Sequence, residues 1–219
     1  MTLGTFNYAL DMLKGSVDDV IEKKGSTSAG LGIAQLKRAT KEATYLKPAS
    51  SFLLAGILTN EKPTEALPLL RELKTEFPQN LVVQMVYITA LYNTGDNEDL
   101  NKEANIFFDQ VTSSPTLSWF RPHAYFAKGL TKFRVKEWKE AAEFFDDAAE
   151  IEDESNPYAT WAVLYQGYCY DAMGERRRAK RKYQQVLKMK RRFASHDHAK
   201  ERLSKPFLPT DIEVNKLEV

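Results

Sequence analysis

The stretch NPYATWAVLYQGYCYDAMGERRRAKRKYQQVLKMKRR, residues 156–192, joins two different patterns at a Gly-Glu turn. Its first part is apolar and aromatic over a length that suits one helix. Its second part, residues 174–192, holds ten Lys or Arg side chains against a single acid, Glu175. This basic part still contains apolar residues at helical spacing, namely Ala179, Tyr183 and Val186, so one of its sides must face a partner helix. The stretch therefore predicts a hairpin of two antiparallel helices.

The apolar pattern of this second helix recurs along the chain. An alanine, a large apolar residue four positions later and a further apolar residue stand at Ala141, Phe145 and Ala148, at Ala104, Phe108 and Val111, and at Ala66, Leu70 and Leu73. The alanines are separated by 38 (66 to 104), 37 (104 to 141) and 38 (141 to 179) residues. Such a period predicts stacked helical hairpins. Gly129 and Gly167 are expected to let the two helices of a hairpin approach closely.

At these residues the chain resembles a tetratricopeptide repeat protein. The last repeat follows the family pattern at five positions: Gly167, Tyr170, Ala179, Tyr183 and Val186. The chain departs from the pattern in its period, which is about 34 residues in the family, and at Ile88 and Lys132, where a glycine and an aromatic residue are usual. The resemblance covers roughly residues 48–192. It implies an all-α fold, a right-handed solenoid of about four to five antiparallel helical hairpins.

The segments outside the array are predicted from weaker signals. Residues 31–46 keep the spacing of a second helix, so we expect an earlier hairpin whose first helix is residues 3–14, with a long loop between them. Residues 194–203 are expected to form a short capping helix, followed by an extended tail interrupted by Pro206 and Pro209. We therefore divide the chain into three parts: an N-terminal hairpin (1–46), the repeat array (47–192) and a C-terminal cap and tail (193–219).

Composition limits the class of protein. The chain has 219 residues, of which 43% are hydrophobic and 28% charged, as in globular proteins. Its 31 basic and 30 acidic residues leave a net charge of +1, so nucleic-acid binding would require a local patch. The lone cysteine, Cys169, allows no internal disulfide and is expected in the core. We identify no secretory leader and no apolar run that would span a membrane, so a cytoplasmic location is expected.

The sequence contains no recognisable motif for catalysis or cofactor binding. It has no Gly-rich phosphate loop, no paired cysteines and no motif that combines a nucleophile with a base. His196 and His198 are two residues apart and would point to different sides of a helix, which argues against a metal site. His123 is expected to be a surface or packing residue. We therefore expect no enzyme activity, no metal and no cofactor.

The first helices of the hairpins are expected to line a concave groove, where such arrays bind their partners. The resemblance places apolar and aromatic residues there: Met85, Tyr92, Phe126, Phe133, Trp161, Tyr165 and Tyr168. Chaperone-binding members use a polar carboxylate clamp, but the corresponding positions here hold apolar residues such as Leu53 and Val86. We predict a non-catalytic scaffold that binds an apolar segment of a protein partner, such as an amphipathic helix. Alternatively, about half of these aromatics pack helix against helix.

The basic segment permits a second interpretation, a nucleic-acid-associated repeat protein that uses residues 176–192 for phosphate contacts. The preceding second helix, KEWKEAAEFFDDAAEIEDE (136–154), is strongly acidic and should lie beside it. We expect part of the arginine set to face these acids, which favours the scaffold over nucleic-acid binding. A third alternative is an accessory domain of a larger assembly.

Overall fold

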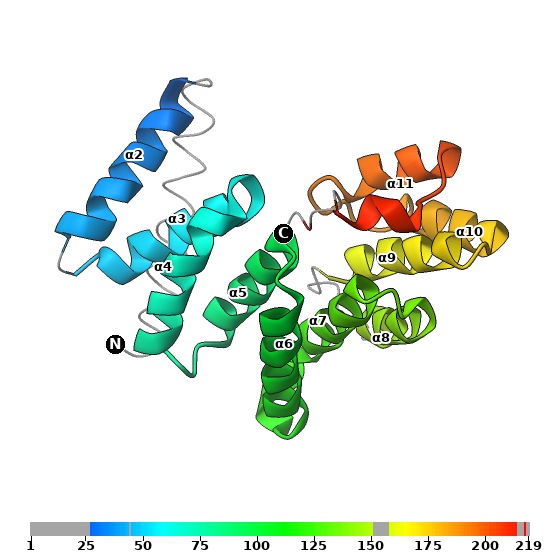
Figure 1. Cartoon of the computed structure of the whole chain (residues 1–219), viewed down its shortest axis with the longest axis horizontal. Helices are drawn as coiled ribbons and strands as arrows, with labels where there is room; N and C mark the ends of the chain where they lie inside the picture. Colours follow the sequence, from blue (N-terminus) through cyan, green and yellow to red (C-terminus); the bar gives the residue numbers. More distant parts are fainter. Residues whose placement is uncertain (1–26, 44, 151–157, 214–216, 218–219) are drawn as a thin grey trace. The chain divides into compact units, whose positions relative to one another are not determined.

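The computed structural model describes residues 27–43, 45–150, 158–213 and 217, and this part of the chain contains helices and no strand. Figure 1 shows the order of the elements. The α-helices are α2 (Thr27–Glu42), α3 (Lys47–Glu61), α4 (Pro63–Glu76), α5 (Leu81–Thr94), α6 (Asn97–Thr112), α7 (Arg121–Arg134), α8 (Trp138–Glu150), α9 (Ala159–Ala172), α10 (Arg176–Val186) and α11 (Ser195–Ser204). Two 3-10 helices are η1 (Pro115–Phe120) and η2 (Pro209–Glu213). The predicted all-α fold is confirmed. None of the helices described is both long and apolar enough to cross a membrane.

The chain divides into two compact units, Met1–Ala90 and Leu91–Val219, and the boundary lies inside α5. In the first unit α2 packs on α3, and α3 packs on α4. Pro48 and Pro63 lie in the first turns of α3 and α4, where an N–H would have no helical partner. The buried side of α4 carries the predicted apolar pattern of Ala66, Leu70 and Leu73.

The predicted boundaries of the N-terminal helix are wrong. α2 spans Thr27–Glu42 instead of residues 31–46, so residues 27–30 are helical instead of forming part of a loop. The physical reason lies at Pro48, which opens α3 instead of closing the preceding helix and therefore requires the chain to turn before it. The predicted first helix, residues 3–14, falls outside the described residues.

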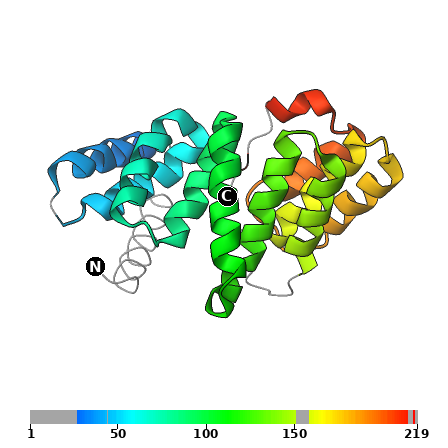
Figure 2. The same ribbon diagram turned by 60° about the horizontal axis from the view of Figure 1, so that its bottom comes forward.

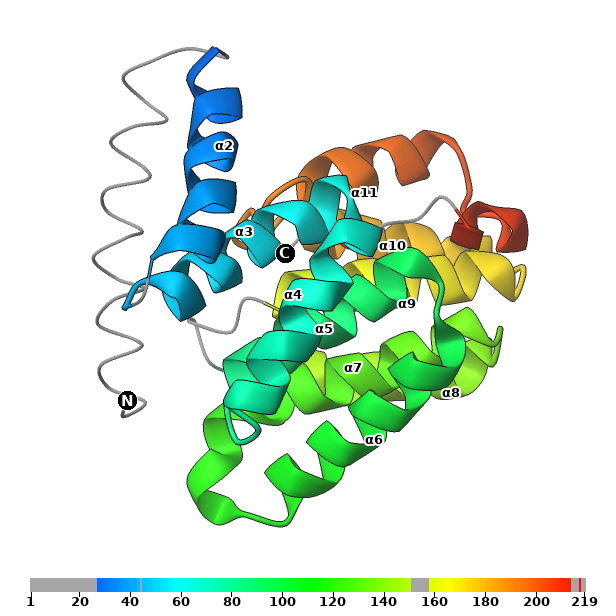
Figure 3. The ribbon, with the colours of Figure 1, turned by 60° about the vertical axis from the view of Figure 1, so that its left-hand side comes forward.

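The second unit is built from helices that pack on their neighbours along the chain. α6 packs on α7, α7 on α8, α8 on α9, α9 on α10, and α10 on α11 (Figures 2 and 3). The turn between α9 and α10 contains Gly174 with a φ of 77°, a conformation that glycine adopts without steric penalty. The pairs α7–α8 and α9–α10 are the predicted helical hairpins.

A glycine sets the close approach of the two helices in each of these hairpins. A Cβ atom on Gly129 would lie 2.6 Å from Phe145 Cδ1, and a Cβ atom on Gly167 would lie 2.7 Å from Tyr183 Cδ1. Both aromatic rings are fully buried. Because interiors are close-packed, the aromatic side chain of the second helix fills the space that the first helix leaves open. The predicted role of these two glycines is confirmed.

In α6 the repeat pattern is shifted by one helical turn from the predicted one, although Ala104 and Val111 are buried as predicted. The alanines of α4, α8 and α10 are the fourth residues of their helices, whereas the fourth residue of α6 is Leu100. Phe107, and not Phe108, is fully buried. Equivalent positions are therefore 34 (66 to 100), 41 (100 to 141) and 38 (141 to 179) residues apart. The longest interval contains η1, which lies between α6 and α7.

Candidate functional site

The residues predicted to form the groove lie mostly inside the protein. Met85, in α5, is partly exposed. The other six are at most 2% exposed: Tyr92 in α5, Phe126 and Phe133 in α7, and Trp161, Tyr165 and Tyr168 in α9. Their assignment to a partner-binding groove stays a prediction, and their surroundings determine which of them a partner would reach.

Tyr165 lies at the centre of a cluster formed by these aromatic side chains. Its ring centroid is 5.0 Å from that of Phe133, 5.2 Å from that of Tyr168 and 5.7 Å from that of Phe126. Its hydroxyl group donates to the hydroxyl oxygen of Tyr92 at 3.2 Å. Ring contacts at these distances are favourable beyond the apolar area they bury. The fold thus brings aromatics of α5, α7 and α9 together.

A segment that follows α11 covers this cluster at Phe133 and Tyr168. We call residues 205–213 together with Leu217 the tail segment. The ring of Phe207 stacks on Tyr168, with centroids 4.7 Å apart and planes inclined at 18°, and lies 5.5 Å from Phe133. Phe207 is fully buried, whereas Leu208 beside it is 47% exposed. The prediction of an extended tail is wrong at Pro209–Glu213, which forms η2. Asp211 stabilises the start of this turn, since its N–H donates to the Leu208 carbonyl and its carboxylate accepts from the Leu208 N–H.

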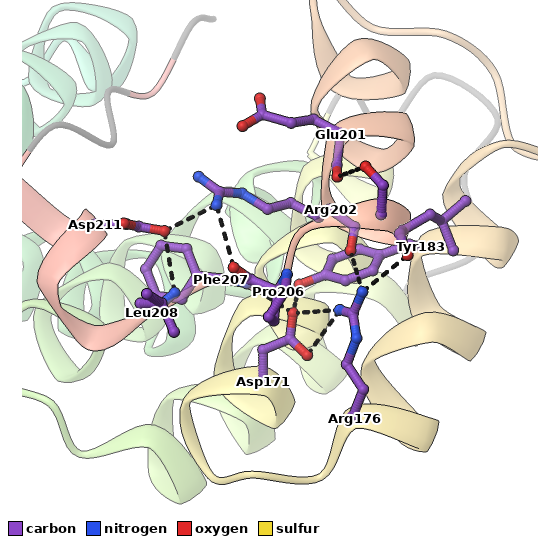
Figure 4. Close-up of polar contacts among 11 residues, drawn as sticks. Asp171, Arg176, Tyr183, Glu201, Arg202, Pro206, Phe207, Leu208 and Asp211 are labelled. Atoms are coloured by element: carbon purple, nitrogen blue, oxygen red, sulfur yellow. Dashed lines mark hydrogen bonds and ion pairs between the residues drawn. The ribbon is translucent and has the colours of Figure 1, made fainter.

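Asp171, near the end of α9, holds the start of the tail segment (Figure 4). Its side chain is fully buried, and its Oδ2 atom accepts hydrogen bonds from the Tyr183 hydroxyl at 2.8 Å and from the Phe207 N–H at 2.9 Å. Arg176 Nη1 donates to both carboxylate oxygens, at 2.8 and 3.0 Å. Burial, together with the Asp171 carboxylate, raises the pKa of Tyr183, so this hydroxyl remains a donor. One carboxylate therefore links α9, α10 and the tail segment.

Arginines extend this polar network from α10 through α11 to the tail segment (Figure 4). Arg176 Nη2 donates to the main-chain oxygens of Arg202 and of the following residue, at 2.8 and 2.9 Å. These carbonyls belong to the last turn of α11, where helical partners are missing. Arg202 Nη1 in turn donates to Asp211 at 2.8 Å, and its guanidinium carbon lies 5.4 Å from the centre of the Phe207 ring. Arg202 therefore contacts the tail segment through an ion pair with Asp211 and through a cation–π contact with Phe207.

Side chains at the ends of α7 and α5 hold the rest of the tail segment by its main chain. Arg134 Nη1 donates to the carbonyl of Ile212 at 3.1 Å. Asn93 pairs with Leu217, since its Nδ2 donates to the carbonyl at 3.0 Å and its Oδ1 accepts from the N–H at 2.8 Å. The side chains of Ile212 and Leu217 are buried. The tail segment thus contacts the C-terminal ends of α9, α7 and α5 in turn.

The basic helix α10 is partly paired and partly exposed. Lys182 Nζ lies 3.7 Å from a carboxylate oxygen of Asp146 in α8. Arg176 and Arg178 instead bind acids of their own hairpin. These two arginines therefore do not belong to the part of the arginine set that was expected to face the acidic helix, because carboxylates closer along the chain are within reach. Three further cations of α10 are exposed: Arg177, Lys180 and Arg181.

The cysteine and histidine side chains considered for catalysis or metal binding do not form a metal site in the described part of the chain. The described residues contain no group of three or more His, Cys, Asp or Glu side chains that could hold a metal ion. Cys169 is fully buried, as predicted, and burial raises the pKa of its thiol. Burial lowers the pKa of His123 to about 4, so its imidazole is neutral at pH 7. His123 packs against Tyr158, with ring centroids 4.3 Å apart, in agreement with the packing role considered for it.

The contacts of the tail segment and the polar residues that hold it were not identified from the sequence. Asp171 and Asn93 lie near the ends of largely apolar helices, where a polar residue is ordinarily solvated. One signal is present in the tail itself, since three apolar residues stand five positions apart: Phe207, Ile212 and Leu217.

Comparison with known proteins identifies one part of the chain. The family described as Tetratricopeptide repeat matches residues 161–189, which include most of α9 and all of α10. No curated protein and no solved structure matches the chain significantly. The matched hairpin is the one that carries Asp171, Arg176 and Tyr183, the polar residues at the start of the tail segment.

Proposed function

Because the chain is a tetratricopeptide-like helical-repeat protein, we propose that it acts as a non-catalytic scaffold that binds a segment of a partner protein. Repeats of this family generally mediate protein–protein interactions. The proposed site is the tail-binding surface, which we define as the residues that contact the tail segment: Asn93, Phe133, Arg134, Tyr168, Asp171 and Arg202. The cytoplasmic location expected from the sequence is part of the same proposal.

The observation that supports this site is the way in which it holds the tail segment. Asn93 binds both main-chain groups of one residue, Arg134 binds a main-chain carbonyl, and Asp171 binds a main-chain N–H. Main-chain contacts tolerate many sequences, while the aromatic rings of Phe133 and Tyr168 favour an apolar side chain. A surface that combines the two kinds of contact is suited to binding peptide segments.

The surface also narrows the kind of segment that we propose as the ligand. The tail segment contains a short 3-10 helix and no α-helix. The side chains of Asn93 and Arg134 bind main-chain groups of the tail segment, whereas the main-chain groups of an α-helix are already bonded to one another within the helix. We therefore propose a partner segment that is not α-helical, in place of the amphipathic helix suggested by the sequence.

We assign the remaining predicted groove residues of this unit to the support of the surface. Tyr165 contacts both Phe133 and Tyr168, and Phe126 and Trp161 contact Tyr165 in turn. A partner on the tail-binding surface would reach Phe133 and Tyr168 directly. Tyr165 would position those two rings from beneath.

Selection of ligands from a random peptide library on the full chain tests the proposal. Hydrogen–deuterium exchange of the chain, with and without a selected peptide, then locates the site. We expect peptides with a Kd below about 100 µM, a standard free energy of roughly −5 to −6 kcal/mol, and slower exchange near Asn93, Arg134 and Asp171. The proposal is wrong if no such peptide emerges, or if the exchange changes are confined to α10 or to other helix faces.

A further inference from the structure

We infer that the tail segment is a ligand bound in cis, and that a partner segment displaces it by presenting apolar side chains at the same five-residue spacing. This inference rests on the proposed function. It adds the chemistry of the partner segment and a means by which access to the surface is controlled.

Each of the three buried apolar residues of the tail segment is bound through its main chain by a different first helix. Phe207, Ile212 and Leu217 are at most 2% exposed, and each has a main-chain group bound by a side chain near the end of one helix. The partners are Asp171 of α9 for Phe207, Arg134 of α7 for Ile212 and Asn93 of α5 for Leu217. The regular spacing in the tail thus matches the regular succession of the first helices. We call these three residues the anchors.

The residues between the anchors show which positions a partner sequence can vary. Leu208 is 47% exposed, and Thr210 is also exposed, so neither side chain is selected by the surface. Asp211 differs, since its carboxylate pairs with Arg202 at 2.8 Å in a largely buried environment. Charge-assisted bonds of this kind select for an acid at that place. The partner segment should therefore carry an acidic residue directly before its second anchor.

Release of the tail segment leaves most contacts within the surface in place. Asp171 keeps its bonds to Arg176 and Tyr183 when the bond to Phe207 is broken, so its buried charge stays paired. Arg202 loses the carboxylate of Asp211, and a partner segment with an acid at that place would restore this pair. Arg134 keeps its bond to Asn97 and its position over the ring of Tyr92. A segment held by side chains at separate points, and not by a helix or sheet ladder, opens more readily than the helices beneath it.

The uncovered surface would expose the rings of Phe133 and Tyr168 to water. Exposed aromatic area of this kind is unfavourable and is usually covered by a binding partner. The surface should therefore exchange between the tail segment and a partner segment instead of standing empty. A partner must compete with the tail, so its apparent affinity is reduced by the fraction of closed molecules.

The test uses a fluorescent peptide of the sequence KPFLPTDIEVNKLEV, residues 205–219, and the full chain. Fluorescence anisotropy gives its Kd for the parent protein, for Ile212→Ala and for the matched control Leu208→Ala, which changes an exposed residue of the same segment. Ile212→Ala weakens only the cis ligand, so the peptide should bind this variant at least about tenfold more tightly than the parent. Leu208→Ala should bind it as the parent does.

Other results would overturn the inference. Equal binding by all three proteins places the peptide elsewhere, and no binding to Ile212→Ala makes the tail segment a fixed part of the fold. If Ile212→Ala does not fold, hydrogen exchange in the parent protein decides. The Phe207 and Leu217 amides should then exchange faster than those of α9, and equal protection contradicts the inference. If the parent protein is a dimer that dissociates in Ile212→Ala, the tail segment binds the surface of a second copy and not that of its own chain, which also overturns the inference.

Failure of this inference is separable from failure of the proposed function. Library peptides that alter exchange near Asn93, Arg134 and Asp171, combined with no binding of the tail peptide to Ile212→Ala, would leave the function standing and remove only the cis ligand. If the tail peptide binds as expected but the library peptides map elsewhere, the cis ligand would stand and the proposed general peptide-binding function of the surface would fall.

Discussion

Replacement of Asp171 by Asn tests whether one buried carboxylate holds α9, α10 and the tail segment together. The amide oxygen can still accept from Tyr183 and Phe207, but the amide nitrogen then faces Arg176 Nη1, a donor that now bonds a carboxylate oxygen at 3.0 Å. Loss of a hydrogen bond to a charged group costs about 1.5 to 3 kcal/mol. Arg176 is 29% exposed, so solvent offsets part of the lost ion pair. We expect the free energy of unfolding to fall by about 2 to 4 kcal/mol.

Thermal and urea unfolding, followed by circular dichroism, measure this effect. The melting temperature should fall by about 4 to 16 °C, from roughly 2 to 4 °C per kcal/mol in a chain of this size. Asp197→Asn is the matched control, because its ion pair with Arg191 is more than half exposed on both sides. It should cost less than about 1 kcal/mol. Equal and small losses in the two variants would refute the role assigned to Asp171.

Trp161→Ala should lower the free energy of unfolding by about 3 to 5 kcal/mol, because the side chain is 1% exposed; an unchanged melting temperature would contradict its place in the core. Gly129→Ala should destabilise the protein by about 1 to 3 kcal/mol, because the new Cβ meets Phe145. Gly56→Ala should stabilise it by up to about 1 kcal/mol, because nothing lies within 4 Å of the new Cβ. The melting temperatures of the two variants should therefore shift in opposite directions. The pKa of His123 is about 4 in the folded protein and 6.5 without burial, so the unfolded chain binds its proton first. Stability should fall by up to about 3 kcal/mol between pH 6.5 and 4, and urea titrations of His123→Phe should lack this loss. Nucleic acid should bind weakly at physiological salt. Submicromolar binding that is lost when Arg177, Arg178 and Arg181 are all changed to Ala would favour the nucleic-acid alternative.

The hairpins were predictable from the sequence because their packing is local. Gly167 and Tyr183 lie in consecutive helices, and the contact between them imposes a small residue in one and a large residue in the other. The register of α6 was not predictable in this way. Ala104, Phe108 and Val111 form an apolar stripe, but Leu100, Ala104 and Phe107 form another with the same spacing. Periodicity alone cannot distinguish two stripes that differ by one helical turn.

The candidate site depended on contacts that no local pattern records. Asp171 and Phe207 are 36 residues apart, and nothing in the sequence of either segment requires them to meet. The aromatic residues of α7 and α9 were correctly placed near one another, since the repeat brings first helices together. The burial of Phe133 and Tyr168 was not predictable, because the ring of Phe207 covers these two side chains.

The glycine in the first helix and the aromatic residue in the second helix constrain each other, so neither can change in size without a change in the other. The two positions are 16 residues apart in both hairpins (129 to 145 and 167 to 183). A larger residue at the glycine position is tolerated only if the aromatic ring is replaced by something smaller, and that second change must arise in the same lineage. Sequence drift in this array should therefore proceed by paired, compensating steps. Such covariation at a separation of 16 would reveal hairpins of this kind in chains too divergent for their repeats to be seen otherwise.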